Sequence, residues 1–322
     1  MIANSGEYRK KNGQRGYVMM NNFIFENKTK VYFGKGGVKE YLGGLLANFG
    51  ETVMLAYGGG SIKCNGVYDE IMGILNAQGK CVVEFSGIMS NPTYAKVQDG
   101  AKLARENHVD LILAVGGGSV SDCCKVISGA FDTLSHAMET YFGKPDENNL
   151  SDDINEAVMR SVIRNIRILL TDPENYDARS ELAQASAMAE NGVLKIGKVT
   201  DFQAHQIQHQ LGAYTDCNHG AGLAVIHPVL YRHIYKSGTA RFTRWAQNVW
   251  GIAPKGSDGE TAAGIDALAA FIKEIGLPTS FAELGIPADT DFRAVADSTN
   301  ITAGCCKKLT HDEIYEILQE CL

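Results

Sequence analysis

The first part of the chain, between residues 21 and 129, alternates short apolar runs with amphipathic segments. The following runs have the length and apolar composition of strands: TVMLAY (52–57), CVVEFSGI (81–88), DLILAV (110–115) and, as an edge strand, TKVYFGKGG (29–37). Residues 67–78 and 94–107 carry apolar positions at helical spacing. Strands that alternate with helices predict an α/β domain with a doubly wound, Rossmann-like parallel sheet. Because the 110–115 run is apolar throughout after Asp110, we expect it to be buried on both faces of that sheet.

Helical periodicity dominates from residue 130 to the end of the chain. It recurs in 152–170, 178–193, 200–212, 239–251, 259–275 and 311–321. These segments predict a second, all-helical domain over residues 130–322, after the α/β domain of residues 21–129. Residues 1–20 are polar and basic and lack the apolar core of a signal peptide, so we expect a disordered extension there.

Composition narrows the class of protein. The chain has 322 residues, of which 45% are hydrophobic, and is long enough for two globular domains. Its net charge of −7 and the absence of a basic patch or Lys/Arg run of the kind that nucleic acid demands argue against a nucleic-acid partner, and it has no apolar run of membrane-spanning length. The eight cysteines form no CxxC pair, which favours reduced thiols in the cytoplasm, and we interpret Cys217 as a buried structural thiol rather than a ligand.

Two pairs of ligand-type side chains have a spacing of four residues. Asp132 and His136 form one pair, His205 and His209 form the other, and His219 follows in the segment NHGAGLAV. Positions i and i+4 lie on one face of a helix, so each pair would present both side chains together. Imidazole nitrogens with a carboxylate oxygen suit iron or zinc rather than calcium. The pattern predicts a metal site that His219 completes from a loop or a helix start.

A simpler interpretation stays open for each of these residues. With eight histidines in the chain, one pair at this spacing also arises by chance on the surface of an amphipathic helix. Glu139 lies seven residues after Asp132 on the same face, where it would support a metal ligand or form a surface salt bridge. The remaining histidines have no motif around them, and we assign them to structure or surface: His108, His227, His233 and His311.

The glycine-rich turns GGGS at 58–61 and 116–119 each stand where an apolar strand meets a helix. Glycine lets the backbone approach a phosphate closely, and the following helix start offers free N–H groups. Neither turn is a GxGxxG fingerprint or a P-loop, and a tight turn also needs glycine without a ligand. Two such turns in one sheet favour a dinucleotide site. Ser61 and Lys63, with no acid nearby in AYGGGSIK, favour NADP over NAD, unless Lys63 is a solvated surface lysine.

Longer motifs extend the comparison to a family. They are YGGGSIKCNGVYDE, NPTYAKVQDGAKLAREN, LILAVGGGSVSDCCK, GAFDTLSHAMETYF and DFQAHQIQHQLGAYTDCNHGAGLAVIHP. Together they resemble the iron-containing (group III) alcohol dehydrogenases, and within them the butanol dehydrogenase-like branch, over most of the chain after Met20. The resemblance implies the fold shared with dehydroquinate synthase. It also implies a homodimer that interconverts primary alcohols and aldehydes with NAD(P) and Fe²⁺ or Zn²⁺.

The resemblance also implies a role for individual residues. Asp132, His136, His205 and His219 would bind the metal, and His209 would face the substrate and the nicotinamide as the catalytic proton relay. The following residues would bind the cofactor: Gly58, Gly59, Gly60, Ser61, Lys63, Asn91, Pro92, Gly116, Gly117, Gly118, Ser119 and Asp122. A dehydroquinate synthase-like lyase is the related alternative, but it uses a Glu/His/His ligand set with surrounding lysines, which this chain lacks near 132–139.

One part of the family pattern is missing. In the family, further strands and a Thr/Ser-rich nicotinamide loop separate the second glycine-rich turn from the helix of the metal aspartate. Here CCKVISGA (123–130) joins FDTLSHAME (131–139) directly, so we expect two helices of different domains to be linked only through residues 128–130. The alternative to an active oxidoreductase is therefore an internally truncated, catalytically impaired remnant that still binds metal or nucleotide.

Overall fold

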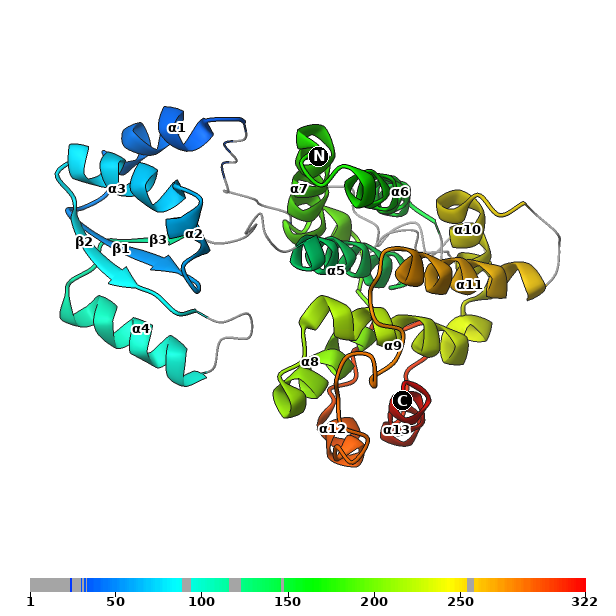
Figure 1. Cartoon of the computed structure of the whole chain (residues 1–322). Coiled ribbons are helices and arrows are strands. Elements are labelled where there is room, and N and C mark those ends of the chain that lie inside the picture. Colours follow the sequence, from blue (N-terminus) through cyan, green and yellow to red (C-terminus); the bar gives the residue numbers. More distant parts are fainter. Residues whose placement is uncertain are drawn as a thin grey trace, which may run out of the picture. The chain divides into compact units, whose positions relative to one another are not determined.

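The computed structural model describes residues 24, 30, 32, 34–88, 94–115, 123–145, 148–253 and 258–322. The chain folds into two compact units (Figure 1), one over Asn27–Val126 and the other containing Ile127–Leu322. The first unit combines a sheet with helices, and the second is built of helices.

The sheet of the first unit has three described strands in the order β2-β1-β3, and both pairings are parallel. Its strands are β1 (Thr52–Tyr57), β2 (Cys81–Phe85) and β3 (Leu111–Val115). The connecting helices are α1 (Gly37–Leu46), α2 (Ser61–Cys64), α3 (Val67–Ala77) and α4 (Tyr94–Glu106). Figure 1 shows α1 and α3 on one face of the sheet and α4 on the other. Helices on both faces of a parallel sheet confirm the predicted doubly wound architecture.

The core of this unit forms around the central strand. Val53, Leu55 and Tyr57 of β1 pack with Leu46 of α1 and with Leu75 of α3. Successive side chains of a strand point to opposite faces, so these alternate residues form one apolar face beneath the two helices. Register follows from this pattern, because a slip of one residue would turn the apolar set away from them.

The expectation that the 110–115 run is buried on both faces is wrong. Ile112 of β3 is 60% exposed, and exposed and half-buried residues alternate along the strand. Among the described strands β3 lies at an edge of the sheet, so one side and part of one face lack cover. The predicted edge strand at 29–37 falls partly outside the described residues. Lys30 and Tyr32 are not assigned to a strand, and α1 begins at Gly37.

The expectation of two helices linked through residues 128–130 is also wrong. CCKVISGA and FDTLSHAME form one continuous helix, α5 (Cys123–Tyr141), which passes through Gly129 without a break. A single glycine costs a helix only about 1 kcal/mol relative to alanine. The apolar residues that follow are almost completely buried, namely Phe131, Leu134, Met138 and Tyr141. Their burial offsets the cost at Gly129, because each buried side chain of this size contributes roughly 1.5–3 kcal/mol.

The second unit confirms the predicted all-helical domain. Its long helices after α5 are α6 (Leu150–Thr171), α7 (Tyr176–Glu190), α8 (Gln203–Thr215), α9 (His219–Ile234), α10 (Thr239–Trp250), α11 (Asp258–Glu274), α12 (Phe292–Ser298) and α13 (His311–Glu320). Two short turns of 3₁₀ helix, Val193–Lys195 and Tyr235–Ser237, connect some of them. In Figure 1, α5 runs between the α6–α7 pair and the α8–α9 pair. Hydrogen bonds from α5 to Glu156 of α6, His205 of α8 and His227 of α9 agree with this central position.

A buried ionic group and an aromatic cluster fix the helices beside the C-terminal end of α5. Asp152, which is inaccessible to solvent, contacts Lys198 and lies 2.9 Å from the guanidinium of Arg241. The ring of Phe142 stacks on Phe242 at 4.0 Å between centroids, and Trp245 packs edge-on against it. Removing one partner of such a buried ionic group typically costs about 3–5 kcal/mol.

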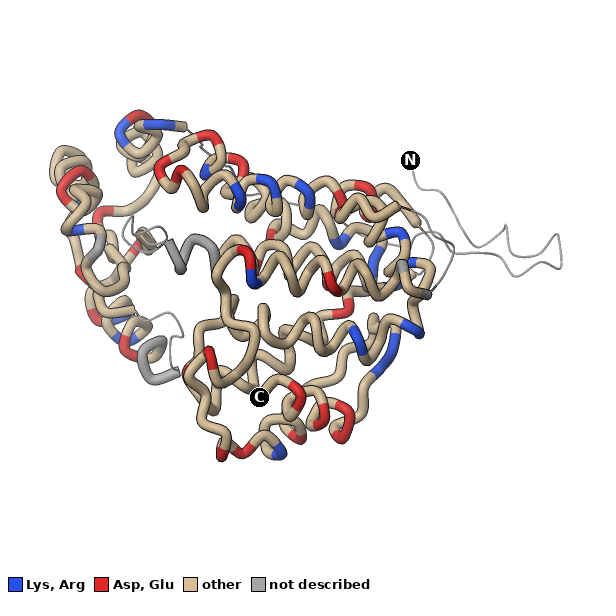
Figure 2. The backbone as a smooth tube through the Cα atoms, turned by 45° about the vertical axis from the view of Figure 1, so that its right-hand side comes forward, with Lys and Arg blue, Asp and Glu red and all other residues tan. Residues whose placement is uncertain are grey.

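Charged residues of both signs are distributed along the second unit. Figure 2 shows Lys and Arg interspersed with Asp and Glu along its helices, while acidic residues predominate near the C-terminal end of the chain. Within the described residues, no helix is both long and apolar enough to cross a membrane.

Candidate metal centre

Three helices contribute the residues of the predicted site. On α5, Asp132, His136 and Glu139 follow one another at intervals of four and three residues, which places them along one stripe of the helix. On α9, His219 is the first helical residue, and the side chain of Asn218 caps the helix by accepting a hydrogen bond from the backbone N–H of Ala221. His219 therefore reaches the site from a helix start, one of the two positions expected for it.

Helix α8 carries His205 and His209 and is held at both ends by unusual backbone. Phe202 before it and Asp216 after it adopt the left-handed conformation, with φ of 54° and 52°. This conformation costs a residue with a side chain about 1–2 kcal/mol. A Cβ on Gly304 would lie 2.1 Å from the carbonyl oxygen of Thr200, so the segment leading into α8 needs glycine beside it. Strain and close packing together fix where α8 begins, and with it the position of His205.

The ligand atoms converge on one oxygen. Oδ1 of Asp132 lies 3.3 Å from Nε2 of His205, 3.4 Å from Nε2 of His219 and 3.6 Å from Nε2 of His136. Nε2 of His136 also lies 3.1 Å from Nε2 of His205. Ligands about 2.0–2.2 Å from a tetrahedral ion are separated by roughly 3.3–3.6 Å. The three separations from Oδ1 of Asp132 match that spacing, and the separation between His136 and His205 is slightly shorter.

The donor set itself fits a divalent ion. Oδ1 of Asp132 and Nδ1 of His136 are buried without a hydrogen-bond partner in the described part of the chain. A buried polar atom without a partner is costly, and an ion held by Asp132 would remove that cost. The ligand atoms of Asp132, His205 and His219 all lie within 4.8 Å of one another, and His136 adjoins two of them. The residues present therefore suit Fe²⁺ or Zn²⁺.

Two further side chains orient the imidazole rings. The carboxylate of Glu139 accepts a hydrogen bond from Nδ1 of His205 and also from the backbone N–H of Ala204, at 2.6 Å. The amide oxygen of Gln208 accepts one from Nδ1 of His219. Each bond places the ring proton on Nδ1 and leaves Nε2 free as a ligand. Of the two roles considered for Glu139, the structure agrees with support of a ligand, because its side chain is completely buried.

The site is electrostatically polarised. Burial opposes ionisation of Asp132, but the close imidazoles of His205, His219 and His136 hold the pKa of its carboxyl well below the usual range. Burial would lower the pKa of His205, yet the charges of Glu139 and Asp132 raise it to about 9. In the metal-free protein His205 is therefore cationic at neutral pH, and a divalent ion bound there would displace the proton from its Nε2.

His209 lies beside the cluster without joining it. Its ring stacks on that of His219 at 5.2 Å between centroids and lies edge-on to His205 at 5.9 Å. Burial and the nearby charge of His219 lower the pKa of His209 below the ordinary histidine value. A neutral imidazole next to a metal centre is suited to accept and return a proton.

The described part of the predicted cofactor site lies in the first unit. Gly58, Gly59 and Gly60 follow β1, and α2 begins at Ser61. Nζ of Lys63 lies 3.5 Å from a carboxylate oxygen of Glu84 and 4.5 Å from the centre of the Tyr68 ring. Asn91, Pro92, Gly116, Gly117, Gly118, Ser119 and Asp122 lie outside the described residues.

Sequence reasoning missed two polar contacts of the centre. Gln208 lies three residues after His205, and helical spacing alone would have placed it beside that histidine. Glu190 is the last residue of α7, and no sequence pattern predicted its contact with His136, because that contact depends on how α7 packs.

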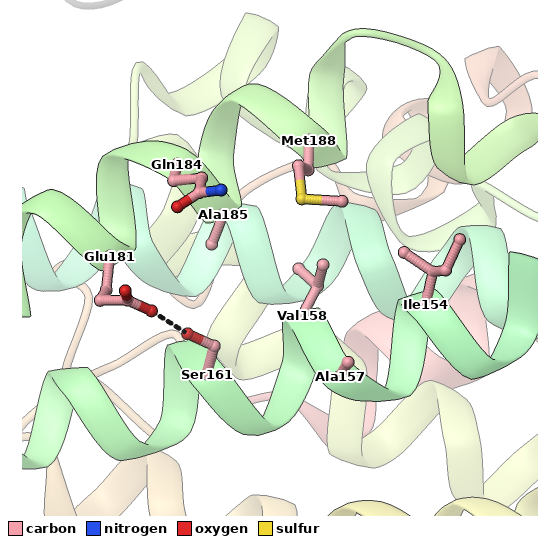
Figure 3. A pocket seen from close by; sticks show the side chains of 8 residues that line it. All are labelled: Ile154, Ala157, Val158, Ser161, Glu181, Gln184, Ala185 and Met188. Atoms are coloured by element: carbon pink, nitrogen blue, oxygen red, sulfur yellow. Dashed lines mark hydrogen bonds between the residues drawn. The ribbon is translucent and has the colours of Figure 1, made fainter. Parts of the chain in front are cut away.

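His227 and Cys217 are buried, which agrees with the structural role expected for each of them. A groove of about 180 Å³ between α6 and α7 (Figure 3) shares none of its lining residues with the centre.

Comparison with known proteins gives the same family over residues 28–322. The family profile "Fe-containing alcohol dehydrogenase family, C-terminal" matches residues 126–322, and the profile "Iron-containing alcohol dehydrogenase" matches residues 28–157. The NADH-dependent butanol dehydrogenase A of Clostridium acetobutylicum is 28% identical, and the match covers 94% of this chain and 100% of the relative. The probable NADH-dependent butanol dehydrogenase 2 of Bacillus subtilis is 30% identical with the same coverage.

A solved structure supports the fold as well. The crystal structure of the NADH-dependent butanol dehydrogenase A of Thermotoga maritima has a TM-score of 0.86 and 26% identity, over 95% of this chain and 100% of the other. The alignment with the Clostridium protein spans 389 positions, more than the 322 residues of this chain, so the alignment contains gaps in this chain. Because the profiles together match nearly all of it, this chain belongs to the iron-containing alcohol dehydrogenase family.

Proposed function

We propose that this chain interconverts primary alcohols and aldehydes of the butanol and butanal type with NAD(P)H and a divalent ion. One observation carries the proposal, namely the convergence of three imidazole nitrogens on Oδ1 of Asp132. Relatives that are named as butanol dehydrogenases or aldehyde reductases support the proposal. Among them is an NADPH-dependent aldehyde reductase of Escherichia coli that is 26% identical. Fe²⁺ is the expected ion, and Zn²⁺ the alternative.

The residues of the centre have two roles, which are to bind the metal ion and to transfer a proton. An ion bound there would polarise the substrate oxygen as a Lewis acid. Asp132, His136, His205 and His219 would hold it, with Glu139 fixing the ring of His205. His209 would accept the proton of the alcohol and return it to the aldehyde during reduction, because its neutral ring lies beside that of His219.

The first test is butanal-dependent oxidation of NADPH, and separately of NADH, by the purified 322-residue chain loaded anaerobically with Fe²⁺. We expect turnover that a chelator removes and that His205→Ala abolishes together with stoichiometric metal binding. Soluble, folded, metal-loaded protein without turnover would contradict the proposal. That result would favour the catalytically impaired remnant, which the comparisons do not otherwise support.

A preference for NADP is the more specific part of the proposal. Lys63 follows the first glycine-rich turn and is the described cation nearest to it in sequence. Its ammonium contacts Glu84, so a 2′-phosphate would have to compete with that carboxylate. We expect Lys63→Ala to raise KM for NADPH about tenfold or more and to leave KM for NADH within about twofold, since a lost charge-assisted bond costs about 1.5–3 kcal/mol. Equal effects on both cofactors would remove Lys63 from phosphate recognition.

A cytoplasmic homodimer completes the proposal. Among the six cysteines whose side chains the structure describes there is no disulfide bond, which supports a reducing compartment. The dimer rests on the family resemblance. Light scattering on the purified chain tests it, and a monomeric mass would contradict it.

A further inference from the structure

Glu190 brings a second carboxylate to the candidate metal centre from an element that carries none of the four predicted ligands. It is the last residue of α7, and its Oε1 lies 2.9 Å from Nε2 of His136. The same nitrogen lies 3.6 Å from Oδ1 of Asp132 and 3.1 Å from Nε2 of His205. Glu190 therefore contacts the very atom with which His136 would bind an ion.

The position of Glu190 in its helix is unfavourable on its own. The last turn of a helix carries a partial negative charge, so a carboxylate there costs about 0.3–1 kcal/mol unless a cation offsets it. An ion held between Asp132 and the histidines would provide that positive charge. The placement of this carboxylate is thus explained by the site it faces.

Metal binding also changes what the contact with His136 can be. In the metal-free chain, Nε2 of His136 can carry a hydrogen and donate it to Glu190. Once that nitrogen binds an ion it has no hydrogen to donate, and the carboxylate oxygen 2.9 Å away loses its partner. Two neighbouring ligands at about 2.1 Å from one ion, at a right angle, are roughly 3 Å apart. The observed separation is therefore the one that two adjacent ligands of a shared ion would have.

We propose that Glu190 is a fifth protein ligand of the divalent ion. The inference rests on the proposed metal site and adds to it a second anionic donor. Its side chain is 52% exposed and contacts the metal-facing nitrogen of His136. Two carboxylates with three imidazoles neutralise a divalent ion and add a hard oxygen donor, which tightens binding and raises the coordination number above four.

The test measures metal binding rather than turnover. The metal-free chain is titrated with Co²⁺ alone, and both the dissociation constant and the intensity of the visible Co²⁺ bands are recorded. Four-coordinate Co²⁺ absorbs more strongly than five-coordinate Co²⁺. We expect Glu190→Gln to weaken Co²⁺ binding tenfold to a hundredfold, on the order found when groups supporting metal sites are removed, and to intensify the bands.

Glu181→Gln is the matched control. Glu181 lies on the same helix with the same exposed fraction, 52%, but bonds to Ser161 at 3.3 Å in the groove of Figure 3. Its substitution removes the same charge and should change neither quantity. A Glu190→Gln variant that binds Co²⁺ within twofold of the unmodified chain, with the same spectrum, would overturn the fifth-ligand assignment alone. Failure of the unmodified chain to bind one equivalent of Co²⁺ would overturn the metal site as well.

Discussion

The buried carboxylate of Glu139 accepts a hydrogen bond from Nδ1 of His205, which leaves Nε2 of the same ring facing Asp132. Two backbone N–H groups, those of Ala204 and His205, hold the same carboxylate in place. One side chain therefore links the start of α8 to α5 and fixes the ring that lies deepest in the site. The arrangement of the ligands therefore depends on Glu139, although the carboxylate oxygen that bonds to His205 is not available to bind the ion.

We predict that Glu139→Gln weakens Zn²⁺ or Fe²⁺ binding about tenfold to a hundredfold, because the neutral amide orients the ring of His205 less firmly and leaves its Nε2 a weaker electron donor to the metal. Competition titration against a chromogenic chelator measures the affinity. Glu156→Gln is the control, since Glu156 is a similarly buried carboxylate that bonds to Tyr141 and Arg244 instead. Equal affinities for Glu139→Gln and the unmodified chain would show that the contact does not support the ligand.

The contact between Glu139 and His205 also predicts that the chain releases a proton when it binds the metal ion. The charges of Glu139 and Asp132 raise the pKa of His205 to about 9, so its ring is protonated in the metal-free chain at pH 8. Metal binding needs the neutral ring, so this histidine loses a proton and the apparent affinity rises by about tenfold per pH unit until about pH 9. Calorimetry in buffers of different ionisation enthalpy should detect about one proton more for the unmodified chain than for Glu139→Gln at pH 8. Identical proton counts would contradict the coupling.

His209 should affect turnover without affecting the metal. Its ring stacks on His219 but takes no part in the converging ligand set, so His209→Gln should keep one equivalent of metal. We expect kcat to fall roughly 10²–10⁴-fold, the usual contribution of a positioned proton-transfer group. His233→Gln, which changes a histidine paired with Glu320 away from the centre, is the control. Metal loss in His209→Gln would instead make His209 a ligand.

The local pattern of the chain predicted which ligand-type side chains lie together better than it predicted the burial of the sheet. Spacing of four residues placed Asp132 with His136 because both lie on one helix, and the helix supplies that geometry without help from packing. Glu190 depends on how α7 packs beside α5, so the residues around it contain no sign of its contact with His136.

The two errors in the fold have physical causes of their own. An apolar run predicts burial only where other elements cover the strand, and Ile112 of β3 is exposed because an edge strand lacks that cover. The link expected at residues 128–130 rested on the two flanking motifs, which belong to different domains in the family. The buried residues after Gly129, which include Phe131 and Leu134, stabilise α5 enough to carry the helix through this glycine.

Asp201, just before α8, should make the chain less stable as the pH rises. Its side chain is completely buried, and Oδ2 has no hydrogen-bond partner within the described residues. Burial and the neighbouring charge of Glu139 raise the pKa of its carboxyl to about 7, against an ordinary value of 3.8. Between about pH 4 and pH 7 the unfolded chain therefore ionises this group while the folded chain does not. The free energy of unfolding falls by up to about 1.4 kcal/mol per pH unit in that range and no further above it.

Asp201→Asn removes the ionisable group while keeping its shape, so the variant should lose this part of the pH dependence. We expect it to be more stable than the unmodified chain by a few kcal/mol at pH 7.5 and nearly equal to it at pH 4.5. Urea unfolding of the metal-free proteins at both pH values, followed by far-ultraviolet circular dichroism, measures the difference. Asp289→Asn, at an exposed position, should follow the unmodified chain at both. If Asp201→Asn also ran parallel to the unmodified chain, Asp201 would have to ionise in the folded protein as readily as it does in water.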